Sequence, residues 1–231
     1  MTTDTPSAEI RTFLIADVRG YTLFTQERGD EAAAKLAGKF ARIAREEIAE
    51  LGGSVIELRG DEALAVFSSA RQAIRAALSL QERFVDETLA DPEIPLLVGI
   101  GLDAGEAVAV EGGYRGGALD LAARLCGMAG PGEILASREV THLARRIDDV
   151  RYVDTGTRQL KGLAEPVSVI RIESESGDTA ARLRPMLPAA PVSPPWTTSR
   201  SPGWAWEIGP GDRATRGSGG PSSATGPEGV V

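Results

Sequence analysis

The chain is short of the residues on which several common site chemistries depend. Its 231 residues include one cysteine, Cys126, and one histidine, His142. These numbers exclude an intrachain disulfide and a zinc cluster of cysteine and histidine ligands. A nucleophile activated by histidine would need His142, but residues 141–146 are typical of a surface helix and carry no nucleophile signature. We therefore expect any chemistry to use carboxylates, lysine, arginine and metal ions.

The chain also lacks an excess of positive charge and long apolar runs. The formal net charge is -8, whereas nucleic-acid and anionic-membrane surfaces need basic patches. No apolar run approaches the ~20 residues of a membrane-spanning helix. Residues 1–6 lack the basic and apolar regions of an export signal. We expect no nucleic-acid partner, no membrane association and a cytoplasmic location.

Composition divides the chain into three parts. We interpret residues 1–9 as a disordered leader, 10–174 as one folded domain and 175–231 as a disordered tail rich in Pro, Gly and Ser. From Gly177 onward lie nine of the fourteen prolines, nine of the 27 glycines and all three tryptophans. Such a segment buries too little apolar surface to order itself. The role of its tryptophans stays open.

Hydrophobic periodicity predicts alternating strands and helices in the folded part. Strands are expected from near 11 to 16 and over 55–58, 63–67, 96–103, 106–110, 133–136, 150–153 and 167–172. Helices are expected near 20–24 and over 30–51, 69–84 and 118–125, with Asp30 as a helix cap and a turn at 104–105. A helix between the first strand and the 55–67 hairpin allows the two to lie side by side.

Two aspartates occupy special places in this pattern. Asp17 ends the first apolar strand, and Asp61 follows Gly60 at the tip of the hairpin. Two neighbouring carboxylates repel each other unless a cation neutralises them, and Mg²⁺ or Mn²⁺ prefers such hard oxygen ligands. We therefore predict metal-assisted phosphate chemistry. The alternative is that both are ordinary turn residues, where aspartate is favoured for local reasons.

Two further positions suit a phosphate ligand. The helix that starts at Gly20, Tyr21 and Thr22 presents unpaired N–H groups, and the helix dipole favours anions there. Asp120 and Arg124 are four residues apart and share a helix face. On their own, these two would be a surface ion pair worth a few tenths of a kcal/mol, roughly.

Four segments, taken in order, resemble the class III adenylate/guanylate cyclase catalytic domain of bacterial type. They are 13–22 (FLIADVRGYT), 60–67 (GDEALAVF), 98–105 (VGIGLDAG) and 116–125 (GGALDLAARL), with 160–167 (LKGLAEPV) closing the match near Glu173. The resemblance implies an α/β (α+β) fold with a ferredoxin-like βαββαβ core. It also implies a head-to-tail homodimer whose active sites are shared between the chains.

The resemblance also assigns roles. Asp17 and Asp61, with the backbone carbonyl of Val18, match the ligands of two Mg²⁺ or Mn²⁺ ions per active site. Arg124 matches the arginine that stabilises charge on the α-phosphate, and Lys161 resembles a lysine that meets the terminal phosphates. The implied reaction converts ATP or GTP into the 3′,5′-cyclic nucleotide and pyrophosphate for intracellular signalling, by two-metal catalysis.

Three positions depart from the family pattern or complicate it. Glu57 stands where adenylate cyclases carry a lysine and guanylate cyclases a glutamate, and a carboxylate accepts from guanine N1–H and its amino group. Gly113 takes the second base-reading position and has no side chain. Asp120 replaces an asparagine that contacts ribose. Its loss of donors would slow turnover by roughly one or two orders of magnitude, the scale of one positioned hydrogen bond.

These departures leave a second hypothesis open. A cyclase-homology domain could bind nucleotide weakly or not at all and act as a dimerising or regulatory module. A diguanylate-cyclase-like domain fits less well, because that family's hairpin tip resembles Gly-Gly-Asp-Glu-Phe. In this chain Arg59 and Ala63 replace the first glycine and the phenylalanine.

Overall fold

The structure is a computed structural model that describes residues 8–160, 162–175, 177 and 179–187. Its strands are β1 (Ala8–Val18), β2 (Ser54–Arg59), β3 (Glu62–Phe67), β4 (Val98–Val110), β5 (Gly113–Arg115), β6 (Ile134–Ser137), β7 (Val150–Arg158) and β8 (Val167–Ser174). Its helices are α1 (Tyr21–Glu50), α2 (Ala70–Ala90), α3 (Gly117–Met128), α4 (Arg138–Ala144) and α5 (Thr179–Leu183), and the 3₁₀ helix η1 (Arg184–Met186) follows them.

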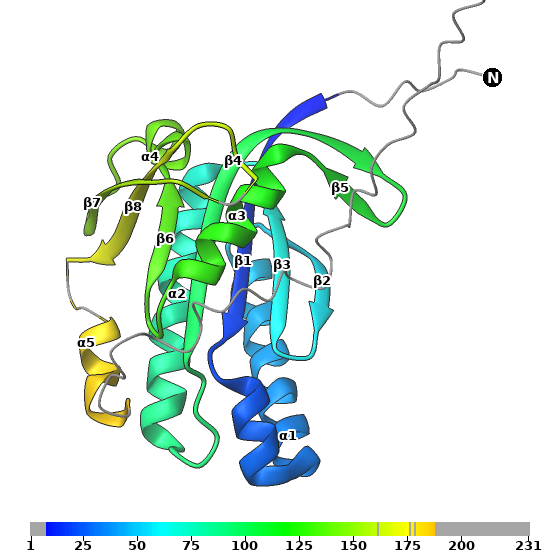
Figure 1. The fold of residues 1–231 in the computed structure, drawn as a ribbon, viewed down its shortest axis with the longest axis vertical. Coiled ribbons are helices and arrows are strands. Elements are labelled where there is room, and N and C mark those ends of the chain that lie inside the picture. The colour runs from blue at the N-terminus through cyan, green and yellow to red at the C-terminus, as the bar shows by residue number, and fades with distance from the viewer. Residues whose placement is uncertain (1–7, 161, 176, 178, 188–231) are drawn as a thin grey trace, which may run out of the picture. The chain divides into compact units, whose positions relative to one another are not determined.

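The strands form one eight-stranded sheet in the order β2-β3-β1-β4-β6-β8-β7, with β5 paired to β4 (Figure 1). The first four strands with α1 and α2 make the predicted βαββαβ core, which is confirmed. In this core β1 runs antiparallel to both of its neighbours, β3 and β4. The C-terminal end of β1 therefore lies beside the β2–β3 turn.

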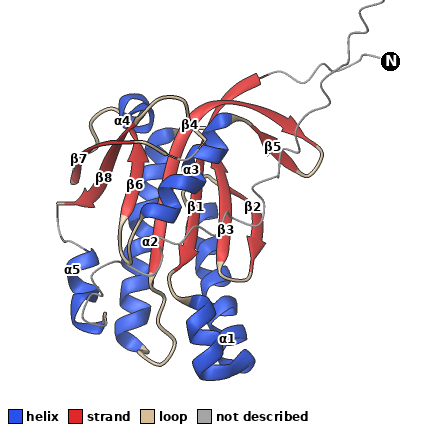
Figure 2. Cartoon of the chain, in the orientation of Figure 1, coloured by secondary structure: helices blue, strands red, loops and turns tan. Residues whose placement is uncertain are grey.

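Helices α1 and α2 cover one face of the sheet, and α3 lies on the other (Figures 1 and 2). Alternate residues of β1, Leu14 and Ala16 among them, pack with the apolar stripes of α1 and α2. Phe40 of α1 stacks on Phe84 of α2 with ring centroids 5.4 Å apart. Full burial of one such side chain contributes about 1.5–3 kcal/mol, so this helical layer stabilises the sheet.

Glycines in β4 allow α3 to approach the other face closely. A Cβ atom on Gly101 would lie 2.1 Å from the Cys126 backbone nitrogen and 2.2 Å from the Ala122 carbonyl oxygen. At Gly99 it would lie 2.7 Å from the Ala129 carbonyl oxygen. A glycine inside a strand often marks such an approach of another backbone. The spacing of these glycines therefore fixes how deeply α3 sits.

The predicted turn at residues 104–105 is wrong. β4 runs unbroken from Val98 to Val110, and its residues from Val98 to Val108 pair with β1. Gly105 does not reverse the chain but makes room for α3, since a Cβ there would lie 3.3 Å from the Cβ of Ala118. The glycine that predicted a turn is instead a position at which α3 packs against β4.

The start of the domain also differs from the prediction. β1 begins at Ala8 rather than near Arg11, because its pairing with β4 extends back to Ala8 opposite Val108. The expected short helix and long helix, by contrast, are both present within α1, which a non-helical break at Gly29 (φ 82°, ψ 169°) divides in two. The break precedes Asp30, where the long helix was predicted to start.

The C-terminal part is ordered further than the sequence predicts. Residues 179–186 form α5 and η1, although the tail was expected to start at 175. Leu183 is fully buried, and Arg182 forms an ion pair with Asp86 of α2 at 2.5 Å. The rest of the expected tail, with Trp196, Trp204 and Trp206, lies outside the described residues, as does the leader up to residue 7. No helix in the described ranges is long and apolar enough to cross a membrane.

Candidate active site

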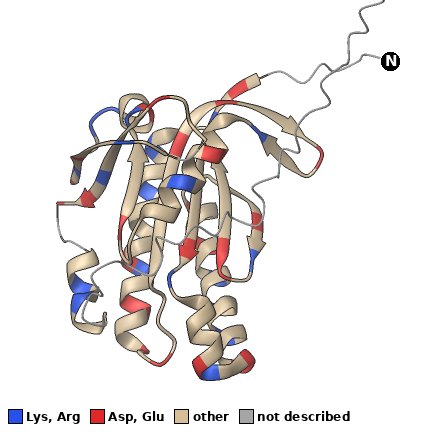
Figure 3. Cartoon of the chain, in the orientation of Figure 1, with Lys and Arg blue, Asp and Glu red and all other residues tan. Residues whose placement is uncertain are grey.

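Asp17 and Asp61 are brought together where β1 ends beside the β2–β3 turn. The Val18 N–H donates to the Asp61 carbonyl oxygen at 3.0 Å, and Asp17 pairs with Glu62 in the register of β1 and β3. Gly60 (φ 57°) supplies the left-handed backbone of the turn. Acidic positions gather at the adjoining ends of β1 and β3 (Figure 3). The predicted neighbourhood therefore forms, and its role in binding metal stays a prediction.

The carboxyl group of Asp17 is held in an environment that disfavours its charge. Burial raises its pKa to about 6, and the Asp61 carboxylate adds to the rise. The guanidinium of Arg19 acts in the opposite direction, because its Nη1 donates to Asp17 Oδ2 at 2.6 Å. A second cation beside these carboxylates would lower the pKa of Asp17 further.

The donor set fits a hard divalent ion that shares its ligands with substrate. In the described part of the chain there is no group of three or more Asp, Glu, His or Cys side chains able to hold a metal ion. Asp17 and Asp61, with the carbonyl of the buried Val18, therefore supply at most a partial coordination shell. Mg²⁺ is usually bound in this way, through one or two carboxylates plus substrate phosphates and water.

The N-terminus of α1 follows directly after this site. Gly20 adopts a left-handed conformation (φ 78°) at the helix cap, and the first turn of the helix contains no acidic residue. Burial, and then the charge of Asp61, raise the pKa of the Tyr21 hydroxyl. Thr22 is exposed. The predicted phosphate-facing residues thus adjoin the aspartates, and a helix start of this kind favours an anion.

Glu57 and Gly113, the predicted base-reading positions, lie in neighbouring places although 56 positions separate them in the sequence. A Cβ on Gly113 would lie 3.5 Å from the Cγ2 atom of Ile56, the residue before Glu57. Arg59 Nε donates a hydrogen bond to the carboxylate of Glu57. Any base recognition here would therefore involve a Glu57–Arg59 pair rather than an isolated carboxylate.

Asp120 and Arg124 take different environments on α3. Asp120 is exposed, and within the described residues no ion pair joins it to Arg124. The guanidinium of Arg124 lies against the β7–β8 loop, since a Cβ on Gly162 would be 3.2 Å from its Nη2 atom. Its Nε is buried and has no hydrogen-bond partner among the described residues. Lys161, next to Gly162, lies outside the described residues.

Sequence reasoning missed Arg19. Its guanidinium bridges Asp17 and the backbone carbonyl of Cys126, a residue 107 positions away. Nothing local in the sequence reports such a long-range contact. The available signal was the glycine at position 99, because a Cβ there would lie 2.5 Å from Arg19 Nη2.

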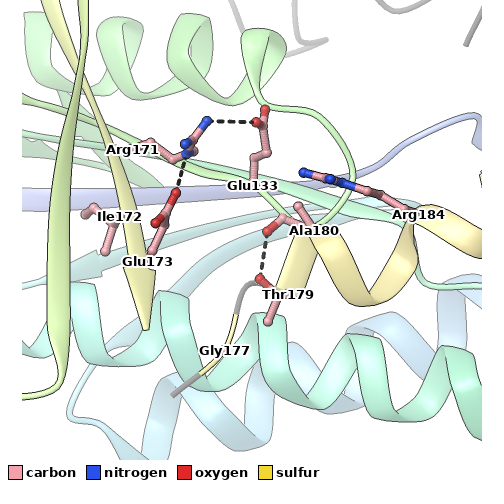
Figure 4. Close-up of a pocket in the computed structure, with 9 residues that line it drawn as sticks. Glu133, Arg171, Ile172, Glu173, Gly177, Thr179, Ala180 and Arg184 are labelled. Atoms are coloured by element: carbon pink, nitrogen blue, oxygen red, sulfur yellow. Dashed lines mark hydrogen bonds and ion pairs between the residues drawn. The ribbon is translucent and has the colours of Figure 1, made fainter. Parts of the chain in front are cut away.

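A separate cavity lies where β6 and β8 meet α5 (Figure 4). Its lining consists of Gly132, Glu133, Arg171, Ile172, Glu173, Gly177, Thr179, Ala180 and Arg184. Arg171 Nε donates to Glu173 at 2.6 Å, and Arg171 Nη1 lies 3.9 Å from Glu133. None of the predicted site residues lines this cavity, and the guanidinium of Arg171 already forms ion pairs with both carboxylates.

Solved structures share the fold. The chain is 26% identical to an adenylate/guanylate cyclase/hydrolase from Silicibacter pomeroyi, with a TM-score of 0.64 over 72% of this chain and 98% of that chain. It is 22% identical to the adenylyl cyclase CyaB from P. aeruginosa, with a TM-score of 0.67 over 75% of this chain and 98% of that chain. No protein-family model matches.

Curated relatives are longer proteins. "Putative adenylate cyclase 3" of Rhizobium meliloti is 25% identical over 184 residues, which is 77% of this chain and 31% of that protein. An uncharacterized protein of Mycobacterium tuberculosis is 31% identical over 157 residues, which is 68% of this chain and 39% of that protein. The chain thus spans between 31% and 39% of the length of these two relatives.

Proposed function

We propose that this chain converts ATP or GTP into the 3′,5′-cyclic nucleotide and pyrophosphate, because its fold and motifs are those of a class III adenylate/guanylate cyclase catalytic domain. The resemblance seen in the sequence is confirmed by the solved structures. The observation that carries the reaction is the contact of Val18 with Asp61, which joins the end of β1 to the hairpin tip and brings two carboxylates together.

The acidic end of β1 is the proposed metal half of the site. Asp17, Asp61 and the Val18 carbonyl would hold Mg²⁺ or Mn²⁺. Ions held by these residues would supply positive charge near the ribose 3′-hydroxyl and the triphosphate. The N–H groups at the start of α1 would hold phosphate oxygens in place.

Helix α3 is the proposed second half of the site. The guanidinium of Arg124 would donate to the oxygens of the α-phosphate as negative charge develops there. Its buried Nε has no hydrogen-bond partner among the residues that the structure describes, and this supports the role, because a guanidinium that binds substrate must keep donors available. In the proposed homodimer, the aspartates of one chain face Arg124 and Lys161 of its partner.

Glu57 favours a guanine base over an adenine base in the bound nucleotide. A carboxylate accepts from guanine N1–H and the exocyclic amino group, whereas adenine N1 needs a donor. Arg59, already bonded to Glu57, offers further donors at the same place. Gly113 adds no side chain, so we expect a modest preference for GTP rather than strict selection.

A second candidate function is a module that binds nucleotide or dimerises without turnover. The exposed Asp120 favours it, because a carboxylate beside a triphosphate adds repulsion and lacks the donors of an amide.

The test is direct. Purified protein is incubated with Mn²⁺ and either ATP or GTP, and cyclic nucleotide and pyrophosphate are separated by chromatography. Asp17→Ala removes a proposed ligand, and Glu46→Ala removes an exposed carboxylate of α1 as the matched control. Product in the wild type and the control but not in Asp17→Ala supports a cyclase. Silence of the wild type with both nucleotides favours the module.

A further inference from the structure

Arg19 is a nearly buried cation placed at the proposed metal site. Its side chain is only 7% exposed, and Nη1 donates to Asp17 Oδ2 at 2.6 Å. Nη2 donates to the Cys126 carbonyl oxygen and lies 3.3 Å from the Cys126 sulfur. One of the two carboxylate oxygens of Asp17 is therefore already taken by a cation of the chain itself.

The fold builds a seat for this guanidinium. A Cβ at position 99 would lie 2.5 Å from Arg19 Nη2, 2.6 Å from Nε and 2.7 Å from the Ala129 backbone oxygen, so Gly99 leaves room for the guanidinium beside the end of α3. The backbone N–H of Arg19 donates to the Leu97 carbonyl at 2.6 Å. Its Nε is buried without a hydrogen-bond partner in the described ranges. The position of Arg19 is thus imposed by packing rather than chosen among surface rotamers.

Arg19 also links the two halves of the site. Cys126 belongs to the last turn of α3, where carbonyl groups lack helical partners and a cation is favourable. Its carbonyl accepts from Ala129 N–H at 3.0 Å as well as from Arg19. Arg124 lies two positions earlier on the same helix. A group that displaced Arg19 from Asp17 would therefore also disturb the end of α3.

A divalent ion at Asp17 would meet two obstacles. It must share a carboxylate with a guanidinium, and it must approach a fixed positive charge in a partly buried place, where charges are poorly screened. A triphosphate adds oxygen ligands and several negative charges to the ion, which offsets both obstacles.

We propose that Arg19 is a built-in competitor for the divalent ion at Asp17, so that the ion is retained only together with the triphosphate. Arg19 acts through Asp17 and is a positioning residue. The proposal rests on the metal site of the proposed function, because it concerns the affinity of that same site.

The test measures Mn²⁺ affinity rather than turnover. Free Mn²⁺ is followed by electron paramagnetic resonance during titration, with and without 3′-deoxy-GTP, an analogue that lacks the hydroxyl group needed for cyclisation. Arg19→Gln and Arg19→Met remove the cation, Arg19→Lys keeps it, and Arg42→Gln removes an exposed arginine of α1 as the matched control. Without nucleotide, both neutral variants should bind Mn²⁺ about tenfold or more tightly than the wild type, on the scale expected for removing one nearby charge. Arg19→Lys and Arg42→Gln should stay within about twofold.

A double variant identifies the ligand. Adding Asp17→Asn to Arg19→Gln should abolish the gain, because the competition is for the Asp17 carboxylate. Persistence of the gain would overturn the proposal.

The remaining outcomes are distinct. If the wild type binds Mn²⁺ in the presence of the analogue, but the neutral variants bind it no more tightly than the wild type does, Arg19 does not compete for the ion. The proposed metal site would then still be supported. Absence of Mn²⁺ binding in every protein, with the analogue present, overturns the metal site and the competitor together. Failure of both neutral variants to fold, judged by circular dichroism, overturns the proposal too, because Arg19 would then serve folding.

Discussion

At the scale of single residues, the half-buried Asp17 and the buried Asp103 show what a neighbouring cation changes. Burial raises the pKa of both Asp17 and Asp103, but only Asp17 has a guanidinium beside it. Asp103 is 5% exposed and accepts a hydrogen bond from the Ser137 hydroxyl, which also caps α4. Its pKa rises to about 7. Asp103 is therefore suited to be a neutral group of the core, whereas Asp17 is kept available to a cation.

Asp103 predicts a pH dependence of stability. Its pKa is 3.8 when unperturbed and about 7 in the folded chain, so between these values only the folded state holds the proton. Stability from this group is present at acid pH and falls as the pH rises toward about 7, by about 1.4 kcal/mol per unit. Between pH 5 and pH 7.5, urea unfolding of the wild type should lose about 2 kcal/mol more than that of Asp103→Asn. Parallel losses in the two proteins would contradict this.

Asp120 predicts a gain of activity. Asp120→Asn restores an amide that can donate to ribose and removes a negative charge beside the triphosphate. We expect kcat to rise about tenfold or more, the scale of one positioned hydrogen bond, with KM changing less. Asp120→Ala serves as the control, since it removes the charge without adding a donor. Equal kcat for Asn and Ala would show that charge, not hydrogen bonding, limits turnover.

The sequence pattern predicted the positions of the two aspartates better than it predicted the residues that contact them. Asp17 and Asp61 each follow a strand or tip signal that is local in the sequence, so their meeting could be predicted. The contact of Arg19 with Cys126 depends on how α3 packs, and no local pattern reports it. The roles of Asp17, Val18, Asp61 and the other site residues stay predictions.

At the scale of elements, the close approach of α3 to β4 decides the geometry of the site. The approach places the C-terminal turn of α3 beside Arg19. It depends on Gly99 and Gly101, where a Cβ would collide with the helix backbone. Because backbone atoms cannot step aside as a flexible side chain can, we expect these positions to tolerate no side chain.

Gly101→Val should therefore displace α3 or prevent folding. We expect a loss of at least about 3 kcal/mol in the free energy of unfolding, typical of severe overpacking of a core. The matched control is Gly127→Ala, within α3 itself, where a Cβ would meet nothing within 4 Å. That change should be neutral or stabilise by up to about 1 kcal/mol. Similar stability of Gly101→Val and wild type in urea would contradict the packing described.

The same glycines explain the wrong turn at 104–105. Gly105 was interpreted as a chain reversal, because glycine in an apolar run often marks a turn. Alternating glycines on one face of a strand are better explained by a backbone that packs there. The core elements, by contrast, were predictable, because the apolar stripes of α1 and α2 repeat over many residues.

At the scale of the whole molecule, the fold is that of a cyclase domain and the assembly is a proposal. Within one chain, Asp17 contacts Arg19 while Arg124 lies against Gly162 of the β7–β8 loop. The aspartates and Arg124, which are the two halves of the predicted site, therefore contact different residues within one chain. Two copies arranged head to tail would bring one chain's aspartates to its partner's arginine.

The most direct test mixes two inactive variants. Asp17→Ala and Arg124→Ala are each assayed alone with Mn²⁺ and GTP or ATP, and then after co-expression that allows mixed dimers to form. A mixed dimer keeps one intact site, made from the Asp17 of one chain and the Arg124 of the other.

Random pairing makes half of the dimers mixed, so the mixture should recover about a quarter of wild-type activity. Recovery of cyclic nucleotide from two silent proteins would establish both the reaction and the shared site. A mixture that stays silent, although the wild type is active under the same conditions and both variants are folded, would contradict the shared site. A silent wild type would contradict the cyclase itself.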